Sequence, residues 1–192
     1  MRVGVLALQG DVREHEELLG SLGAEVIAVR RPNDLKDLDG LVIPGGESTA
    51  ISKLINLFGL MQPLRDFVKQ KPVLATCAGL ILLADDIEGR LADQELIGGL
   101  NIGASRNAYG SQTDSFEAEV QYESAVERVA FIRAPKILDS RDTEILATYK
   151  GEAVAVKQGK LIAACYHPEI TGSTFLHSLF ITEIETRKKA VI

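Results

Sequence analysis

Short apolar runs alternate with stretches of helical periodicity through the first half of the chain. Four runs have the length and composition of buried strands: residues 2–8, 24–29, 41–43 and 73–76. Apolar residues at helical spacing predict four helices between and after them: residues 11–22, 48–57, 60–69 and 79–84. Because strands that alternate with helices form a parallel sheet covered on both faces, this half predicts an α/β fold of three layers.

The second half of the chain is richer in strands. Residues 100–156 have a strand-rich pattern, which predicts an antiparallel extension of the sheet. Two turn signals interrupt this segment: Tyr109-Gly110 and Lys150-Gly151. Residues 161–166 return to a buried strand, and residues 173–189 predict a closing helix. No repeat or linker divides the sequence, so we expect one domain over residues 1–192.

Several polar residues on the predicted helices have structural explanations. Asp11 precedes the first helix and Glu14 follows three residues later, which predicts a capping box. His15 and His177 lie on predicted helices, and we expect both at the surface. A basic run ends the last helix, where cations interact favourably with the helix dipole: Arg187, Lys188 and Lys189. We therefore assign none of these residues a role in chemistry.

Composition and charge exclude several classes of protein. The chain has 192 residues, 46% of them hydrophobic and 25% charged, which is ordinary globular usage and not that of a disordered chain. The net charge of −6 argues against a nucleic-acid partner, because phosphate binding needs clustered Lys and Arg. No targeting segment is visible and no apolar run approaches the roughly 18 residues of a membrane span. We therefore expect a cytoplasmic protein with no membrane partner.

The two cysteines have different sequence contexts. Two cysteines cannot form a disulfide scaffold, so each is more simply a free thiol in a reducing compartment. Cys77 ends an apolar strand, has small neighbours and directly precedes a helix, which is the strand–turn–helix setting of a nucleophile. The helix N-terminus favours its thiolate. Cys165 lies on a strand without such a turn, and we expect it to be a packed core residue.

A second candidate motif, Tyr166-His167-Pro168-Glu169, follows the last apolar strand. Parallel sheets place their functional sites at the carboxyl ends of their strands, so this motif and Cys77 are expected at one edge. Glu169 can orient the imidazole of His167 and stabilise its protonated form, as the acid does in a catalytic triad. A lone histidine would carry little weight, but Cys77, His167 and Glu169 together predict nucleophilic catalysis.

Two glycines follow the third predicted strand, in the segment Ile43-Pro44-Gly45-Gly46-Glu47-Ser48. Because glycine has no Cβ, backbone N–H groups here can point at a ligand. The N–H groups of Gly46 and Ala78 are candidates for an oxyanion hole. A nucleotide site is not indicated, since neither a phosphate-binding loop nor a dinucleotide fingerprint occurs. Cys165 and His167 lack further ligands at metal-binding spacing, so we expect neither a metal nor a cofactor.

Four segments together resemble the class I, or triad, glutamine amidotransferases: Leu8-Gln9-Gly10, Pro44 to Ser48, Thr76 to Gly79 and His167-Pro168-Glu169. Further stretches are similar to one family in that class, the glutaminase subunits of pyridoxal 5′-phosphate synthase: Val12 to His15, Ser105 to Gly110, Asp114 to Glu117 and Phe131 to Pro135. The resemblance covers nearly the whole chain. It implies a flavodoxin-like fold of three layers with the antiparallel extension.

The resemblance also implies roles. L-glutamine would be hydrolysed to glutamate and ammonia through a γ-glutamyl thioester, with Cys77 as nucleophile, His167 as general base and acid, and Glu169 as orienting acid. The positions that match the family's glutamine-binding residues are Gly46, Glu47, Ser48, Arg106, Ile132 and Arg133. A guanidinium can bind the glutamine α-carboxylate or organise nearby acceptors, and the sequence leaves open which arginine does which. The implied partner is the synthase component, a β/α barrel, in a complex of twelve synthase and twelve glutaminase subunits.

Three residues depart from the family pattern. Ala75 replaces a glycine two positions before Cys77, Ser111 replaces a basic residue, and Tyr166 replaces a phenylalanine. If the basic residue docks the synthase, Ser111 puts one interface contact in doubt. Ala75 is small enough to fit, and Tyr166 is expected to matter little.

Two alternatives stay open. The chain could be the glutaminase of imidazole glycerol phosphate synthase, which has a similar size and the same Cys and His-Pro-Glu set. The stretches Arg106-Asn107 and Ile132 to Pro135 argue against this alternative. The chain could also be a non-catalytic flavodoxin-like binding or chaperone module, or another cysteine hydrolase of this architecture. An intact Cys, His and Glu set disfavours the module.

Overall fold

The computed structural model of the chain describes residues 1–106 and 115–190. The strands are β1 (Arg2–Leu6), β2 (Glu25–Val29), β3 (Gly40–Ile43), β4 (Val73–Thr76), β5 (Ala84–Glu88), β6 (Leu100–Ser105), β7 (Phe116–Tyr122), β8 (Val126–Phe131), β9 (Lys136–Asp139), β10 (Glu144–Tyr149), β11 (Glu152–Gln158) and β12 (Leu161–Ala164). The helices are α1 (Val12–Ser21), the 3-10 turn η1 (Pro32–Leu35), α2 (Ser48–Leu57), α3 (Met61–Gln70), α4 (Ala78–Leu83), α5 (Pro168–Thr171) and α6 (Phe175–Ala190). The strands and helices predicted in the first half are all present, with ends shifted by at most two residues.

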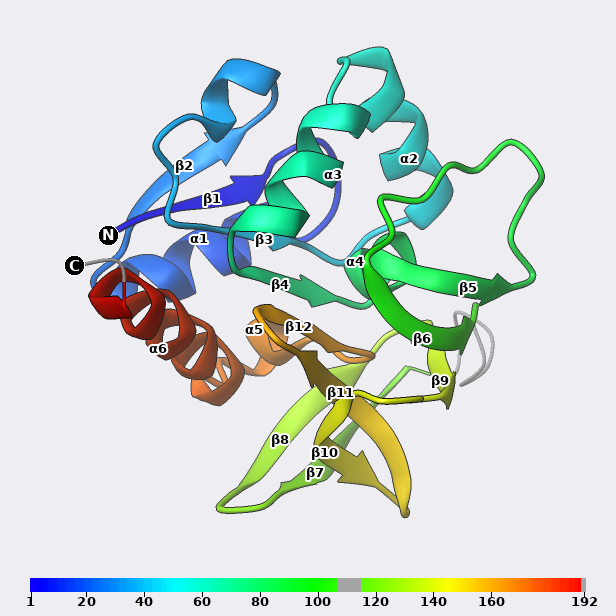
Figure 1. The fold of residues 1–192 in the computed structure, drawn as a ribbon. Helices are drawn as coiled ribbons and strands as arrows, with labels where there is room; N and C mark the ends of the chain where they lie inside the picture. Colours follow the sequence, from blue (N-terminus) through cyan, green and yellow to red (C-terminus); the bar gives the residue numbers. More distant parts are fainter. Residues whose placement is uncertain (107–114, 191–192) are drawn as a thin grey trace.

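Nine strands of the described ranges form one sheet in the order β2-β1-β3-β4-β12-β11-β10-β7-β8 (Figure 1). Strands β2, β1, β3, β4 and β12 pair in parallel. Strands β11, β10, β7 and β8 continue the sheet in antiparallel pairing. The predicted three-layer α/β fold with an antiparallel extension is therefore confirmed, and β12 is the strand at which the pairing changes.

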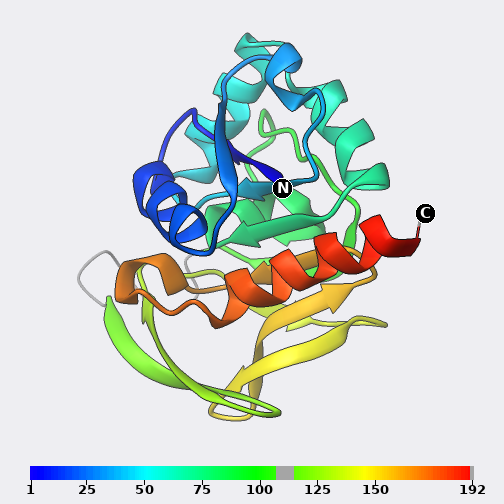
Figure 2. The ribbon, with the colours of Figure 1, turned by 90° about the vertical axis from the view of Figure 1, so that its left-hand side faces the viewer.

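Helices cover both faces of the parallel half of the sheet (Figures 1 and 2). Helices α2 and α3 lie on one face, and α1 and α6 lie on the other. Helix α6 approaches β3 closely because residue 40 is glycine. A Cβ atom on Gly40 would lie 2.6 Å from Ile184 Cδ1 and 2.8 Å from Phe180 Cζ. The absence of that atom lets α6 pack directly on the strand.

A second, smaller sheet holds three of the described strands. Strand β5 pairs in parallel with β6, and β9 pairs with β6 in antiparallel fashion. The expectation that residues 100–156 only extend the main sheet is wrong for β6 and β9, and β5 is not predicted at all. Three exposed acidic residues, Asp85, Asp86 and Glu88, give β5 no apolar alternation that would mark it as a strand.

Residues that depart from the family pattern lie in the core where they are described. Ala75 is fully buried in β4, and Tyr166 is fully buried after β12. The Tyr166 hydroxyl has a hydrogen-bond partner in the hydroxyl of Tyr122, so the extra oxygen is satisfied. Cys165 is also fully buried, which confirms its predicted place in the core. The predicted turn at Tyr109-Gly110 and the neighbouring Ser111 lie outside the described residues.

The edge strand β8 lies against the segment that follows β12. The backbone N–H of His167 donates a hydrogen bond to the carbonyl oxygen of Ala130 in β8, at 2.8 Å. Ile132 and Arg133 follow β8 directly, so this contact places them near His167. The antiparallel extension thereby contributes residues to the carboxyl edge of the parallel half.

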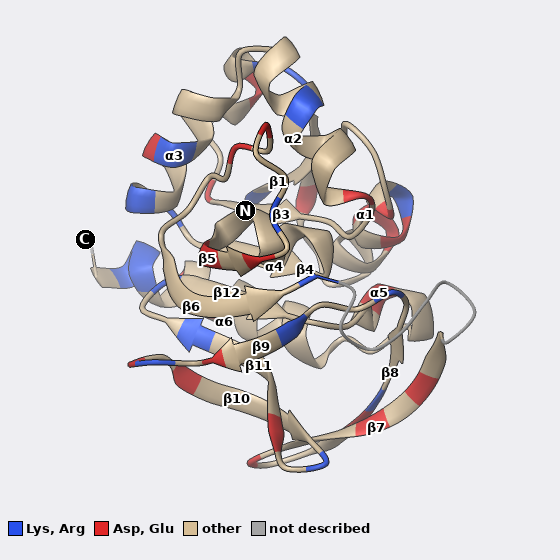
Figure 3. Ribbon diagram, turned by 90° about the vertical axis from the view of Figure 1, so that its right-hand side faces the viewer, with Lys and Arg blue, Asp and Glu red and all other residues tan. Residues whose placement is uncertain are grey.

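Charged residues are distributed over many elements (Figure 3). Basic residues lie on α2, on α3 and in the last turn of α6 in this view, and acidic residues lie on β5 and β7. Among the helices that the structure describes, none combines the length and apolar character that crossing a membrane requires.

Candidate functional site

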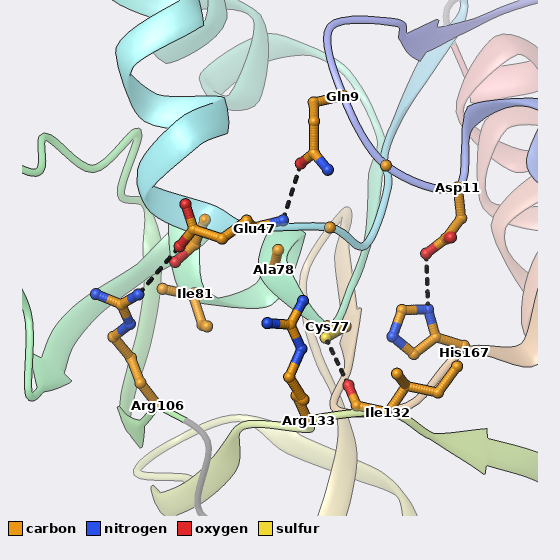
Figure 4. A pocket seen from close by; sticks show the side chains of 13 residues that line it. Gln9, Asp11, Glu47, Cys77, Ala78, Ile81, Arg106, Ile132, Arg133 and His167 are labelled. Carbon is orange, nitrogen blue, oxygen red and sulfur yellow. Dashed lines mark hydrogen bonds and ion pairs between the residues drawn. The ribbon is translucent and has the colours of Figure 1, made fainter. Parts of the chain in front are cut away.

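The carboxyl ends of three adjacent parallel strands meet at one pocket of about 230 Å³ (Figure 4). Gly46 follows β3, Cys77 follows β4 and His167 follows β12, as the parallel topology predicts. The pocket is lined by Gln9, Gly10, Asp11, Gly46, Glu47, Ser48, Cys77, Ala78, Ile81, Arg106, Ile132, Arg133 and His167. All the residues expected at the site therefore line one cavity, except Glu169, which lies behind His167.

Cys77 sits at a strained turn between β4 and α4. Its φ of 46° and ψ of −103° are unusual for a residue with a side chain, and such strain is concentrated at functional sites. The turn needs glycine at position 79, because a Cβ atom there would lie 2.2 Å from the carbonyl oxygen of Ile43. The Cys77 thiol donates a long hydrogen bond to the Ile132 carbonyl oxygen at 3.8 Å. The sulfur is thus held at the floor of the pocket, with 5% of the residue exposed.

The imidazole of His167 lies between two carboxylates. Its Nδ1 is 2.8 Å from Glu169 Oε1 and 3.1 Å from Asp11 Oδ2. Burial lowers the pKa of His167, but the neighbouring Asp11, Cys77 and Glu169 outweigh burial and raise that pKa well above its ordinary value. The buried Nε2 has no hydrogen-bond partner among the described residues. The ring is therefore fixed at Nδ1 and free to exchange a proton at Nε2.

Asp11 does not have the role expected of it. It is the N-cap residue of α1, but its side chain makes no capping hydrogen bond, so the predicted capping box with Glu14 is wrong. The carboxylate faces His167 across the sheet edge instead (Figure 4). An acidic residue in the loop after a parallel strand is the sequence signal for such a contact. The same residue is equally well explained as the N-cap of the helix that follows. Only the order of the strands in the sheet, with β1 beside β3 and then β4 and β12, decides between them.

His15 and His177 are not surface residues, contrary to expectation. Both are fully buried between α1 and α6. His15 Nδ1 lies 2.8 Å from His177 Nε2, and His15 Nε2 lies 3.1 Å from Thr76 Oγ1. His15 Nε2 also lies 3.5 Å from Glu169 Oε1. The sequence did contain a signal, because His15 precedes the buried Leu18 and Leu19 by three and four residues and shares their face.

The glycine loop after β3 is held by the loop after β1. Gln9 Oε1 accepts a hydrogen bond from the Glu47 N–H at 2.8 Å. Gly46 has a φ of +148°, and a Cβ atom on it would lie 2.5 Å from Gln9 Oε1. Gly46 and Ala78, the two candidate oxyanion residues, both line the pocket. Glycine at position 46 is thus required both by its backbone angle and by the close approach of Gln9.

The two candidate arginines differ in their contacts. Arg106 Nη2 lies 3.2 Å from Glu47 Oε1, and Arg106 Nη1 donates to Gln94 Oε1 at 3.2 Å. The Glu47 carboxylate also accepts from the N–H groups of Thr49 and Ala50 and so caps α2. The Arg133 guanidinium points into the pocket and has no ion pair among the described residues (Figure 4). Arg106 is therefore a paired residue of the wall, whereas Arg133 has its charge available.

Comparison with known proteins agrees with this geometry. Residues 5–186 match the SNO glutamine amidotransferase family. This chain belongs to that family. A Streptomyces avermitilis protein named pyridoxal 5′-phosphate synthase subunit PdxT is 49% identical, over 97% of this chain and 95% of its own length. A protein of the same name from Shouchella clausii is 46% identical, over 97% of both chains.

Solved structures extend the comparison from the family to the fold. A crystal structure titled glutamine amidotransferase is 41% identical, with a TM-score of 0.89, and covers 95% of this chain and 98% of its own. A glutamine amidotransferase from Thermotoga maritima is 16% identical, with a TM-score of 0.60, and covers 98% of this chain and 85% of its own. The second likeness concerns the fold alone. Both agree with the flavodoxin-like architecture expected of the SNO family.

One cluster in this amidotransferase has the composition of a metal site. Asp11, His167 and Glu169 offer ligand atoms that lie within 4.8 Å of one another. The distances from His167 Nδ1 to the two carboxylates, 2.8 and 3.1 Å, are those of hydrogen bonds. A shared Nδ1 proton therefore accounts for the cluster without an ion.

We expect this SNO family protein to lose stability as the pH falls from about 6.5 to about 4. Burial lowers the pKa of His177 to about 4, and burial with the nearby His177 and His167 lowers that of His15 well below its ordinary value. The unfolded chain therefore takes up these protons first, so stability present above pH 6.5 is lost as the pH falls through the folded values. For His177 the loss is about 3 kcal/mol.

Urea denaturation at several pH values between 7 and about 4.5 measures this effect. The variant His177→Gln lacks one titrating group and is expected to show the smaller pH dependence. The raised pKa of His167 has the opposite effect, because the stability that it contributes is lost as the pH rises. The unchanged protein and the variant both contain His167, so this effect is the same in the two. If the unfolding free energy of His177→Gln fell with pH as steeply as that of the unchanged protein, the assignment of His177 as a neutral buried group would be contradicted.

Proposed function

We propose that this chain hydrolyses L-glutamine to glutamate and ammonia, with Cys77, His167 and Glu169 as its catalytic triad. The observation that carries the proposal is the meeting, at one pocket, of a strained cysteine with a histidine held by a buried carboxylate. A nucleophile, a base and an orienting acid in this order are what acyl transfer requires. The family membership supports the same reaction.

The chemistry follows from these positions. The Cys77 thiol turns from Ile132 towards His167 Nε2, which takes its proton, and the thiolate attacks the side-chain amide carbon of glutamine. The N–H groups of Gly46 and Ala78 stabilise the oxyanion. His167 then protonates the leaving ammonia, and water activated by His167 hydrolyses the γ-glutamyl thioester. The products are glutamate, ammonia and the free thiol.

Arg133 is the residue that we propose to bind the α-carboxylate of glutamine, because its guanidinium faces the pocket without a protein partner among the described residues. Arg106 holds Glu47 in place, and Ser48 and Ile132 complete the wall. Because Arg133 binds substrate away from the reacting carbon, Arg133→Gln is expected to raise KM for glutamine by about 10- to 100-fold with a smaller change in kcat.

Steady-state glutamate release at varied glutamine concentration measures this split. The matched control is Arg128→Gln, because Arg128 lies on β8, 72% exposed and paired with Glu117 away from the pocket. We expect the control to keep the KM of the unchanged protein. An unaltered KM in Arg133→Gln would exclude this carboxylate site.

We propose that the ammonia passes to the synthase subunit of a pyridoxal 5′-phosphate synthase, in a complex of twelve copies of each subunit. Ammonia released into neutral water is protonated to ammonium, which is not a nucleophile, so direct delivery is expected. Support comes from relatives that are named as a subunit of that synthase. These relatives align with this chain over nearly their whole length. By resemblance, we expect little glutaminase activity without the partner.

Glutamate release with and without the synthase subunit tests the partner. A marked rise on its addition is expected, and the mass of the assembled complex gives the number of copies. Equal rates in both assays would contradict the dependence on the synthase. Activation by the imidazole glycerol phosphate synthase instead would identify the alternative partner.

A further inference from the structure

A row of buried polar side chains continues behind Glu169, away from the pocket. His15 of α1 contacts Glu169 and Thr76 through Nε2, and it contacts His177 of α6 through Nδ1. All four residues are buried, and the two histidines are fully so. Burying polar groups costs free energy unless they are hydrogen-bonded, so an apolar pair would be the simpler filling between two helices. The arrangement needs a reason beyond packing.

The contacts fix which nitrogen of each ring carries the proton. Glu169 Oε1 already accepts the Nδ1 proton of His167 and can only accept. A lone pair on His15 Nε2 would face this carboxylate at 3.5 Å, whereas a proton there lies between Glu169 Oε1 and Thr76 Oγ1. His15 Nδ1 is then an acceptor, and the Nε2–H of His177 donates to it at 2.8 Å.

We propose that His15 is a positioning residue for Glu169, held in its Nε2–H tautomer by His177. Its effect on the reaction rests on the proposed glutaminase function. The Nε2–H group is shared with Thr76 Oγ1 at 3.1 Å and lies 3.5 Å from Glu169 Oε1, so its positive end faces the carboxylate. This keeps Oε1 of Glu169 directed at His167 and stabilises the ionised form of Glu169. Helix α6 is thereby connected to the site through two imidazoles, although none of its residues lines the pocket.

Both rings are neutral in this arrangement. Burial lowers the pKa of His15 well below its ordinary value and that of His177 to about 4. The ionisable groups that face His15 are His177 on one side and Glu169, with His167 beyond it, on the other. Each neutral ring carries one N–H group. The N–H of His177 donates to His15, and the N–H of His15 donates towards Thr76 and Glu169. Nδ1 of His177 has no partner among the described residues, as expected for its unprotonated nitrogen.

Nitrogen NMR of the protein labelled in histidine tests the tautomers directly. The chain has 3 histidines, so each signal can be assigned by substitution. At pH 7 we expect His15 and His177 to be neutral, each protonated at Nε2. A proton on His15 Nδ1, or a charged His15 ring, would overturn the proposal. This measurement does not depend on activity. Its result stands even if a Cys77→Ala variant kept glutaminase activity and so showed that the proposed function is wrong.

Kinetics of the complex with the synthase subunit test the consequence. His15→Leu removes the donor and is expected to lower kcat about 10-fold, with KM for glutamine within about twofold, because Glu169 does not line the pocket. His15→Gln places an amide N–H where Nε2 was and is expected to restore kcat to within about threefold. Equal losses of kcat in both variants, or a change in KM with kcat unaltered, would show that His15 only packs. Urea denaturation of both variants separates instability from lost positioning.

Discussion

Replacing Cys77 with alanine is expected to lower glutamate release by about 10⁴-fold or more in the assembled enzyme. The substitution removes the only sulfur that lines the pocket among the described residues, and alanine offers no atom that can form the thioester. Because Cys77 is nearly buried at a turn that already tolerates a Cβ atom, the fold is expected to be kept. The loss therefore measures chemistry and not stability.

Cys165→Ala is the matched control for Cys77→Ala. Cys165 is fully buried in the same part of the sheet, and burial raises its pKa far above the ordinary value, so it stays a thiol. We expect this variant to keep most of its activity. A diazoketone or chloroketone analogue of glutamine is expected to label the protein once, at Cys77, when the synthase is present. Glutaminase activity in Cys77→Ala, or no labelling of the unchanged protein, would sink the proposed mechanism.

Replacing Glu169 with glutamine is expected to lower kcat by about 10³- to 10⁴-fold while KM changes little. The carboxylate accepts the Nδ1 proton of His167 at 2.8 Å, which leaves Nε2 free to take the proton of Cys77. A glutamine can instead donate to Nδ1 through its amide. The ring would then carry its proton on Nε2, facing Cys77, and could not act as the base.

Asp11→Asn is the matched control, because Asp11 is the other carboxylate at His167 Nδ1. Its oxygen lies 3.1 Å from the ring nitrogen and its side chain is 31% exposed, whereas the Glu169 side chain is fully buried. Solvent weakens the exposed contact, so we expect a loss of no more than about 10-fold. Glutamate release for both variants, at equal synthase concentration, compares the two. If Asp11→Asn is the more damaging change, the orienting role belongs to Asp11.

The sequence predicted the parallel half of the fold and the residues that face its pocket. Alternating apolar runs and helical spacing have clear periods, so the strands and helices predicted there could be placed to within two residues. Cys77 and His167 each follow an apolar strand, and parallel strands bring their carboxyl ends together. The meeting of these residues therefore follows from local patterns and one rule of topology.

Other features could not be read from local patterns. Asp11 precedes a helix and His15 lies on one, and the sequence gives each a simple local role as cap or surface residue. Strand β5 has an exposed, acidic pattern, and its pairing depends on a partner that follows later in the chain.

The sequence by itself determined the layered α/β architecture and the chemistry of the residues around the pocket. Only the tertiary structure decided that Asp11 faces His167 and that His15 and His177 form a buried row behind Glu169. The physical reason is that the hydrogen-bond partner of a polar side chain is set by which elements pack together. His15 and His177 are 162 positions apart, and no local pattern specifies a contact over that separation.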